Sequence, residues 1–122
     1  MVLAGALNAC GSGQDAEVEG VATDFHTAIS DRDGDAACAL LAPSTVTELE
    51  SSAGKPCPQA VVEEKLPPAS DPVSVDVFGT SGQVRFDSET TFLARYEQGW
   101  RVVAAGCTPR ESHPYDCTLT GG

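Results

Sequence analysis

Residues 73–107 read VSVDVFGTSGQVRFDSETTFLARYEQGWRVVAAGC, and this stretch decides the fold class. Its first part alternates valine with polar residues, which is the two-residue period of a strand with one buried face. Turn sequences at residues 79–82, 87–88 and 98–99 divide the stretch into short strands joined as hairpins. We therefore expect an antiparallel sheet of about four strands in which neighbours in the chain are neighbours in the sheet.

Helical signals precede the sheet. In residues 17–32 apolar side chains recur every three or four positions, which is typical of an amphipathic helix. This stripe consists of Val18, Val21, Ala22, Phe25, Ala28 and Ile29. Shorter helical segments are indicated at residues 36–41, after Ser44 and around residues 60–66, before the break at Pro67. Because helices come first and hairpin-linked strands follow, we predict an α+β fold with the helices packed on one face of the sheet.

The composition is that of a small globular domain. The chain has 122 residues, of which 41% are hydrophobic and 20% charged, so it can form one modest core and no second domain. The formal net charge is -11. Such a surface repels polyanions, and we expect no nucleic-acid partner. The acidic surface either serves solubility alone or attracts a basic partner or loosely held cations.

The N-terminal residues carry a second signal. Residues 1–9 (MVLAGALNA) are apolar and are followed directly by Cys10. The LNAC run at residues 7–10 resembles the lipobox of bacterial lipoproteins. That resemblance implies that Cys10 receives diacylglycerol on its sulfur and becomes the mature N-terminus. Residues 1–16 would then comprise a signal remnant, the lipobox and a flexible tether. The alternative is an ordinary apolar N-terminus with an unrelated cysteine.

The other cysteines indicate the compartment. Cys38, Cys57, Cys107 and Cys117 form an even set, which favours two disulfides. Three pairings exist, and we predict Cys38–Cys57 and Cys107–Cys117 because each closes a short loop within its own region. Residues 108–122 would then be a disulfide-tethered tail. Because structural disulfides persist outside the cytoplasm, we predict an extracytoplasmic protein, lipid-anchored at the cell membrane or secreted.

The order of elements resembles a known family. A leading helix, short helices and a meandering sheet whose last strand begins Gly99-Trp100-Arg101-Val102 resemble the NTF2-like (SnoaL-like) family. The resemblance covers residues 17–107 and implies a curved sheet, here a reduced form of the family's cone. Together with the lipobox, it points to the small exported NTF2-like lipoproteins of bacteria. This scaffold carries isomerases, hydrolases and non-enzymatic modules, so it does not define an activity.

Few residues suggest chemistry. His26 on the first helix and Asp76 on the first strand are the weak candidates for an acid or base. Asp76 and Arg85 are expected to face each other across the first hairpin, which also describes an ordinary ion pair. Phe25, Ile29, Phe92 and Tyr96 are the candidate lining of a cavity between helix and sheet, with plain core packing as the alternative. No metal-ligand spacing, phosphate loop or dinucleotide motif is present, so we expect no metal and no cofactor.

These observations favour one function and leave two others open. The favoured hypothesis is an exported, lipid-anchored, non-enzymatic domain that binds a protein partner or a small ligand. The first alternative is an isomerase or hydrolase of the SnoaL-like type with its acid or base in the helix–sheet cavity. The second is a structural accessory of a membrane complex, which would expose an apolar patch near Leu93 and Val103 on the outer sheet face.

Overall fold

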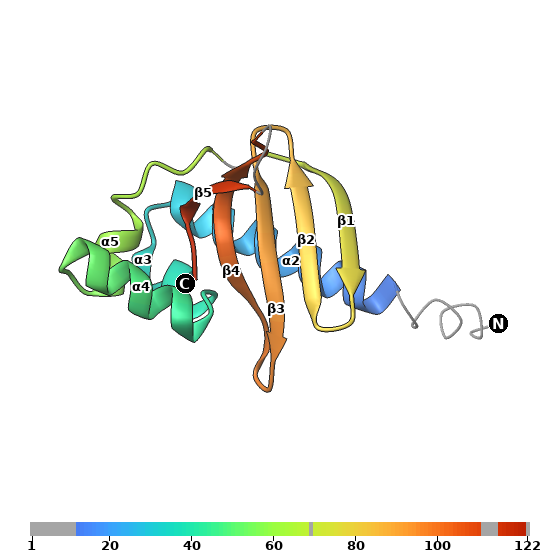
Figure 1. The fold of residues 1–122 in the computed structure, drawn as a ribbon, viewed down its shortest axis with the longest axis horizontal. Coiled ribbons are helices and arrows are strands. Elements are labelled where there is room, and N and C mark those ends of the chain that lie inside the picture. The colour runs from blue at the N-terminus through green and yellow to red at the C-terminus, as the bar shows by residue number, and fades with distance from the viewer. Residues whose placement is uncertain (1–11, 69, 111–114, 122) are drawn as a thin grey trace.

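The protein has an α+β fold, as the element order predicts. A computed structural model describes residues 12–68, 70–110 and 115–121 (Figure 1). The helices come first in the chain: α2 (Ser12–Ser30), α3 (Gly34–Ala39), α4 (Pro43–Ala53) and α5 (Cys57–Val61). The strands follow: β1 (Pro72–Phe78), β2 (Ser81–Phe86), β3 (Thr90–Tyr96), β4 (Gly99–Thr108) and β5 (Asp116–Leu119).

The described strands form one antiparallel meander in the order β1-β2-β3-β4-β5. The sheet therefore has five strands, and the expectation of about four was wrong. The missed strand, β5, lies in the segment interpreted as a tail. It is only four residues long, and it pairs with the ten-residue β4 through Ala105↔Leu119 and Cys107↔Cys117. A four-residue strand is too short to show a clear two-residue alternation in the sequence. Its position depends instead on the partner strand β4 and on the cysteine pair.

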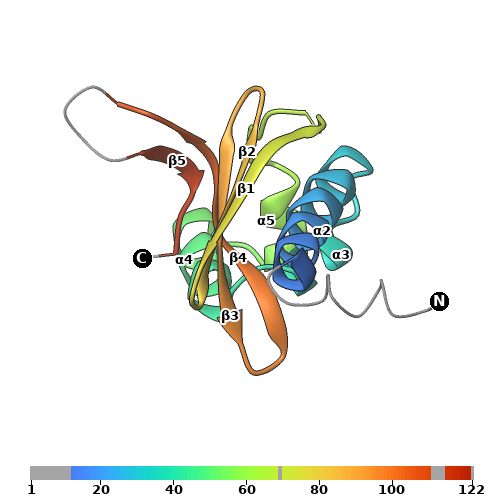
Figure 2. The same ribbon diagram turned by 90° about the vertical axis from the view of Figure 1, so that its right-hand side faces the viewer.

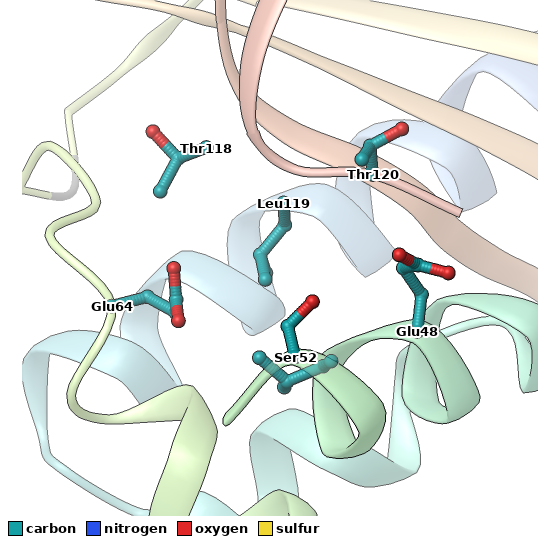
Figure 3. Close-up of a pocket in the computed structure, with 7 residues that line it drawn as sticks. Glu48, Ser52, Glu64, Thr118, Leu119 and Thr120 are labelled. Carbon is teal, nitrogen blue, oxygen red and sulfur yellow. The ribbon is translucent and has the colours of Figure 1, made fainter. Parts of the chain in front are cut away.

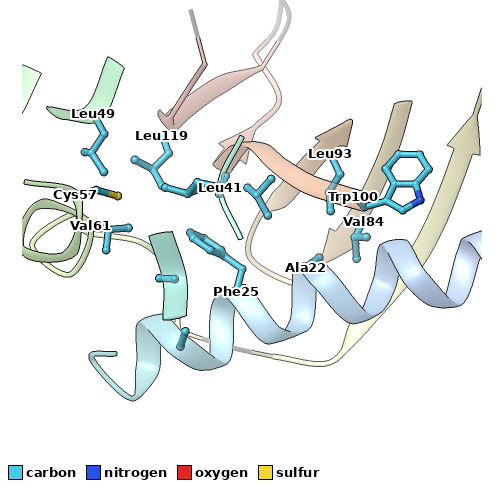
Figure 4. Close-up of a cluster of buried hydrophobic side chains, with 14 of the residues drawn as sticks. Ala22, Phe25, Leu41, Leu49, Cys57, Val61, Val84, Leu93, Trp100 and Leu119 are labelled. Atoms are coloured by element: carbon cyan, nitrogen blue, oxygen red, sulfur yellow. The ribbon is translucent and has the colours of Figure 1, made fainter. Parts of the chain in front are cut away.

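Helix α2 runs across one face of the sheet (Figure 2). Its buried stripe includes Val18, Ala22 and Phe25, each fully enclosed. In Figure 4 Ala22 and Phe25 point toward Val84, Leu41 and neighbouring core side chains. We call the sheet face under α2 the inner face and the opposite face the outer face.

The first helix begins earlier than predicted. It starts at Ser12, so residues 12–16 are helical and the expected flexible tether is wrong for this part of the chain. The reason is compositional: residues 14–17 (QDAE) are compatible with a helix, and Asp15 in the first turn interacts favourably with the positive end of the helix dipole.

The second helix, α3, is capped by Asp33, whose side chain accepts from the Ala36 N–H at 3.1 Å.

One edge of the sheet, along β4, is closed by the chain itself. The Ala42 N–H donates to Val102 O at 2.8 Å, and the Val102 N–H donates to Leu40 O at 2.7 Å. The Thr45 hydroxyl, in the first turn of α4, donates to Val103 O at 2.8 Å. Strand β5 covers the remainder of β4. We call this side the closed edge.

The other edge is formed by β1, and we call it the open edge. Within the described residues β1 pairs only with β2. Its side chains include the two most exposed large apolar residues of that part of the chain, Val73 at 52% and Phe78 at 71%. Strand β1 is therefore an edge strand of seven residues, whereas the edge strand at the other end of the order, β5, has four.

Candidate functional site

A buried polar cluster lies between α2 and the sheet. His26 Nε2 is 2.9 Å from Thr91 Oγ1 and 3.0 Å from Glu89 Oε2. The Thr91 hydroxyl lies 2.8 Å from that same carboxylate oxygen, and the Gly106 N–H donates to Glu89 Oε1 at 2.6 Å. The His26 and Glu89 side chains are 3% and 2% exposed, so the cluster is almost completely buried. It joins α2, β3 and β4 through one carboxylate.

The local backbone explains why these groups meet. Glu89 ends the connection between β2 and β3, and its carbonyl accepts from the Phe86 N–H at 2.8 Å, which closes a tight turn. Gly106 has a φ of 68°, a left-handed conformation that favours glycine, at an irregular step in the β3–β4 register. This irregularity directs its N–H toward Glu89 rather than along the ladder.

The hydrogen-bond directions in the cluster are constrained. A carboxylate only accepts, and the Thr91 hydroxyl already donates to Glu89, so Nε2 of His26 must carry the proton that links the ring to both groups. Glu89 thus receives donors from three elements, which is how a buried charge is tolerated. His26 Nδ1 is buried and has no hydrogen-bond partner among the described residues.

Aromatic rings enclose the imidazole. Phe25 lies edge-on at a centroid distance of 5.4 Å, and Phe86 lies edge-on at 5.0 Å. Two pockets lie among the described residues, and neither is lined by His26. The arrangement links helix α2 to the sheet through the imidazole, which lines neither of these pockets.

Both pockets open to solvent, and the larger one adjoins the cluster, because Glu89 and Phe86 are among its lining residues. The smaller, about 100 Å³, is between α4 and the end of the chain (Figure 3) and presents the carboxylates of Glu48 and Glu64 with the hydroxyls of Ser52, Thr118 and Thr120. The larger, about 300 Å³, lies beside the β2–β3 turn. Its lining consists of Arg85, Phe86, Asp87, Ser88, Glu89, Thr90, Cys107, Thr108, Pro109 and Tyr115. The described residues contain no group of three or more His, Cys, Asp or Glu side chains placed to hold a metal ion.

The structure separates the two catalytic candidates. His26 is in the core, whereas Asp76 is exposed on β1. The expected pairing of Asp76 with Arg85 is wrong, because Asp76 lies opposite Gln83 and Arg85 lies opposite Ser74. The two-residue turn at Gly79-Thr80 sets this register. The Arg85 Nε donates to Ser74 Oγ at 3.3 Å instead.

The expected cavity lining is also divided between two faces. Phe25 is fully buried under the sheet and Ile29 is half-buried beside it, so both belong to the core. Phe92 and Tyr96 point to the outer face, where Phe92 stacks edge-on with Tyr115 at 4.9 Å.

The choice of face was wrong for a simple reason. Alternation separates Phe92 from Leu93 but does not say which of them faces the helix. Gly82 lies opposite Leu93, and a Cβ on Gly82 would meet Val18 of α2 at 3.0 Å. Leu93 therefore lies on the inner face and is 2% exposed, so it does not contribute to an outer apolar patch.

Four cysteines form the two predicted disulfides. The structure contains the disulfide Cys38–Cys57, which joins α3 to α5, and the disulfide Cys107–Cys117, which joins β4 to β5. Cys10, the candidate lipidation site, lies outside the described residues. No helix in the described ranges is both long and apolar enough to cross a membrane.

Glu89 and Thr91 are the cluster members that the sequence did not reveal. Nothing in the sequence distinguishes Glu89 from the exposed Asp87 two positions earlier. The only local hint is that Thr91 follows it at the two-residue spacing that places both side chains on one face of a strand.

Fold and site together define a disulfide-bonded α+β domain with a buried polar cluster and an edge strand, β1, that pairs only with β2 within the described residues. No protein-family model, no curated protein and no solved structure matches the chain.

Proposed function

We propose that this protein is an exported, lipid-anchored domain that binds a partner and does not catalyse a reaction, on a reduced NTF2-like scaffold. The helix-first order and the meandering antiparallel sheet support the scaffold. The two disulfides support an oxidising, extracytoplasmic location. The apolar run before Cys10 supports the lipid anchor.

One observation carries the non-catalytic part of the proposal. His26, the side chain best suited to acid–base work, donates through Nε2 to Glu89 and Thr91 and is enclosed by Phe25 and Phe86. A catalytic base needs hydrogen-bond reach to a proton of the substrate. A ring buried to this extent stabilises the fold instead.

Chemical modification of histidine tests this part. The chain has two histidines, so a His113→Gln variant leaves His26 alone. We expect diethyl pyrocarbonate to leave the folded variant unmodified and to modify His26 after unfolding in urea, read as absorbance of the carbethoxylated ring. Modification of the folded protein at the rate of free imidazole would overturn the non-catalytic assignment.

Expression of the full chain in a bacterium that processes lipoproteins tests the anchor. We expect labelled palmitate on the wild-type protein and fractionation with membranes. A Cys10→Ser variant should lose both, because the other four cysteines are committed to disulfides. Equal labelling and fractionation of the two proteins would contradict the anchor.

An isomerase or hydrolase of the SnoaL-like type remains the second candidate, and one observation favours it. His26 Nδ1 has no hydrogen-bond partner in the described ranges, while a carboxylate orients the other ring nitrogen. This is the geometry of an oriented base. It requires α2 to separate from the sheet, and the modification experiment above detects that opening.

A further inference from the structure

The open edge presents a strand with unpaired backbone groups. β1 forms a continuous antiparallel register with β2 from Ser74↔Arg85 to Phe78↔Ser81, and no other described segment pairs with it. Its far side therefore offers the N–H and C=O groups that an added strand would use.

The usual protections of an edge strand are weak here. Pro72 and the irregular step at Val73 both lie at the beginning of β1, so they leave residues 74–78 regular. The strand contains no lysine, and its one charged residue, Asp76, projects from the outer face rather than inward. Nothing in residues 74–78 prevents another extended segment from pairing.

Exposed apolar groups mark both ends of this edge. Val73 is 52% exposed and Phe78 is 71% exposed. Five residue steps separate them, or about 17 Å in an extended strand. That length matches an added strand of ordinary size, with an apolar contact available at each end.

The negative charge along the open edge favours a basic binding partner. Asp71 and Asp76 are both exposed along this edge, and the chain carries a net charge of -11. A second copy pairing antiparallel about Asp76 would set two like charges side by side, which is unfavourable. A segment that carries lysine or arginine would instead be attracted to the same positions.

We propose that β1 binds an extended, basic segment of a partner protein, which adds to the sheet as a further strand. This inference rests on the proposed binding function and names the surface and the class of partner. Backbone hydrogen bonds supply much of the affinity, and the alternating basic side chains that face Asp71 and Asp76 supply selectivity.

Peptide binding to the folded full chain tests the inference. The probe is a fluorescein-labelled peptide of about eight residues that alternates valine and lysine, a length within the range of natural strands. One control peptide carries glutamate in place of lysine, and another carries N-methyl groups on alternate amides. We expect fluorescence anisotropy to report binding of the lysine peptide alone, together with slower hydrogen exchange in residues 73–78.

Two matched variants locate the site. Asp76→Lys and Asp116→Lys change the net charge equally, and both replace an exposed strand aspartate, the first on the open edge and the second on the closed edge. We expect Asp76→Lys to weaken binding at least ten-fold and Asp116→Lys to weaken it less than three-fold. Circular dichroism establishes that both variants are folded.

Several outcomes would overturn the inference. Equal weakening by the two variants would indicate attraction to overall charge, and undiminished binding of the N-methylated peptide would exclude strand addition. A dimer in light scattering that Asp76→Lys alters would make a second copy the occupant. Absence of peptide binding would refute this site, whereas the histidine-modification and lipidation results would still decide the proposed function separately.

Discussion

The closed and open edges of the sheet satisfy their backbone groups in opposite ways. At the closed edge, β4 receives hydrogen bonds from residues 40–42, a side-chain bond from Thr45 and a whole strand, β5, which is further tied by Cys107–Cys117. At the open edge, β1 pairs with β2, and no second neighbour lies among the described residues. Strand β5 is an edge strand as well, but it has only four residues and is joined to β4 by a disulfide, so the seven-residue β1 is the longer free edge among the described residues.

The buried cluster extends this asymmetry into the core. Glu89 binds the N–H of Gly106 on β4 and the imidazole of α2, so the helix is fastened on the side of the closed edge. No comparable polar link joins α2 to β1 among the described residues. We therefore expect the free energy of local opening to be highest around β3 and β4 and lowest in β1.

The largest effect should follow from breaking the cluster. Glu89→Ala leaves the Gly106 N–H, the Thr91 hydroxyl and His26 Nε2 without their shared acceptor in a buried site. We expect a loss of about 3–5 kcal/mol in the free energy of unfolding, measured by urea denaturation. Asp87→Ala removes an exposed carboxylate two residues away and should change stability by less than about 0.5 kcal/mol. Similar effects of the two substitutions would show that the cluster does not fasten the helix.

Removal of the strand-tethering disulfide should have the next largest effect. The Cys107→Ala, Cys117→Ala double variant frees a loop with a sequence separation of 10, which costs about 3 kcal/mol on the chain-entropy account. We expect faster hydrogen exchange in β5 and in the second half of β4. The amides of β1 and β2 should exchange faster only by the amount that the loss of global stability explains. A uniform increase over the whole sheet, beyond the global change, would contradict a separate closed edge.

These features were unequally visible in the sequence. The fold class, the helical stripe around Phe25 and the hairpins in residues 73–107 depend on short-range periodicity, and the structure has them. The strand β5 and the outward direction of Phe92 depend on what packs against the segment, and the sequence alone led to the wrong result for both. Local pattern defines elements and their two faces, but it does not define which face a distant helix covers.

The buried cluster was hidden for the same reason. His26 was identified from its residue type, yet its surroundings require Glu89 from the β2–β3 turn and Gly106 from β4. These residues are far apart in the chain, and an irregular step in the register brings them together. No spacing rule covers a contact of this kind, so the sequence indicated His26 as a weak acid–base candidate without its buried partners.

Alanine substitutions at two glycines, one near each edge, should have effects of intermediate size on stability. Gly106 and Gly79 both have positive φ, 68° and 61° respectively, so alanine costs about 1–2 kcal/mol at each. A Cβ on Gly106 would also meet Thr118 at 2.8 Å and Leu66 at 2.9 Å, whereas a Cβ on Gly79 meets nothing within 4 Å. We expect Gly106→Ala to destabilise the protein by at least about 1 kcal/mol more than Gly79→Ala in thermal or urea unfolding. Equal losses of stability in the two variants would mean that β5 shifts to accommodate the added methyl group without an energetic cost.

The smallest effect on stability should come from the open edge itself. Phe78→Ser replaces a ring that is 71% exposed, so little buried apolar area is lost, and we expect a change within about 0.5 kcal/mol. Phe92→Ser removes a half-buried ring that stacks on Tyr115 on the same outer face, and it should cost about 1–2 kcal/mol. A large loss from Phe78→Ser would mean that Phe78 is covered by a part of the chain and is not free for a partner. Retained stability combined with weaker binding of the basic peptide would assign the exposed ring to recognition, because a side chain that contributes nothing to the fold then contributes to the complex.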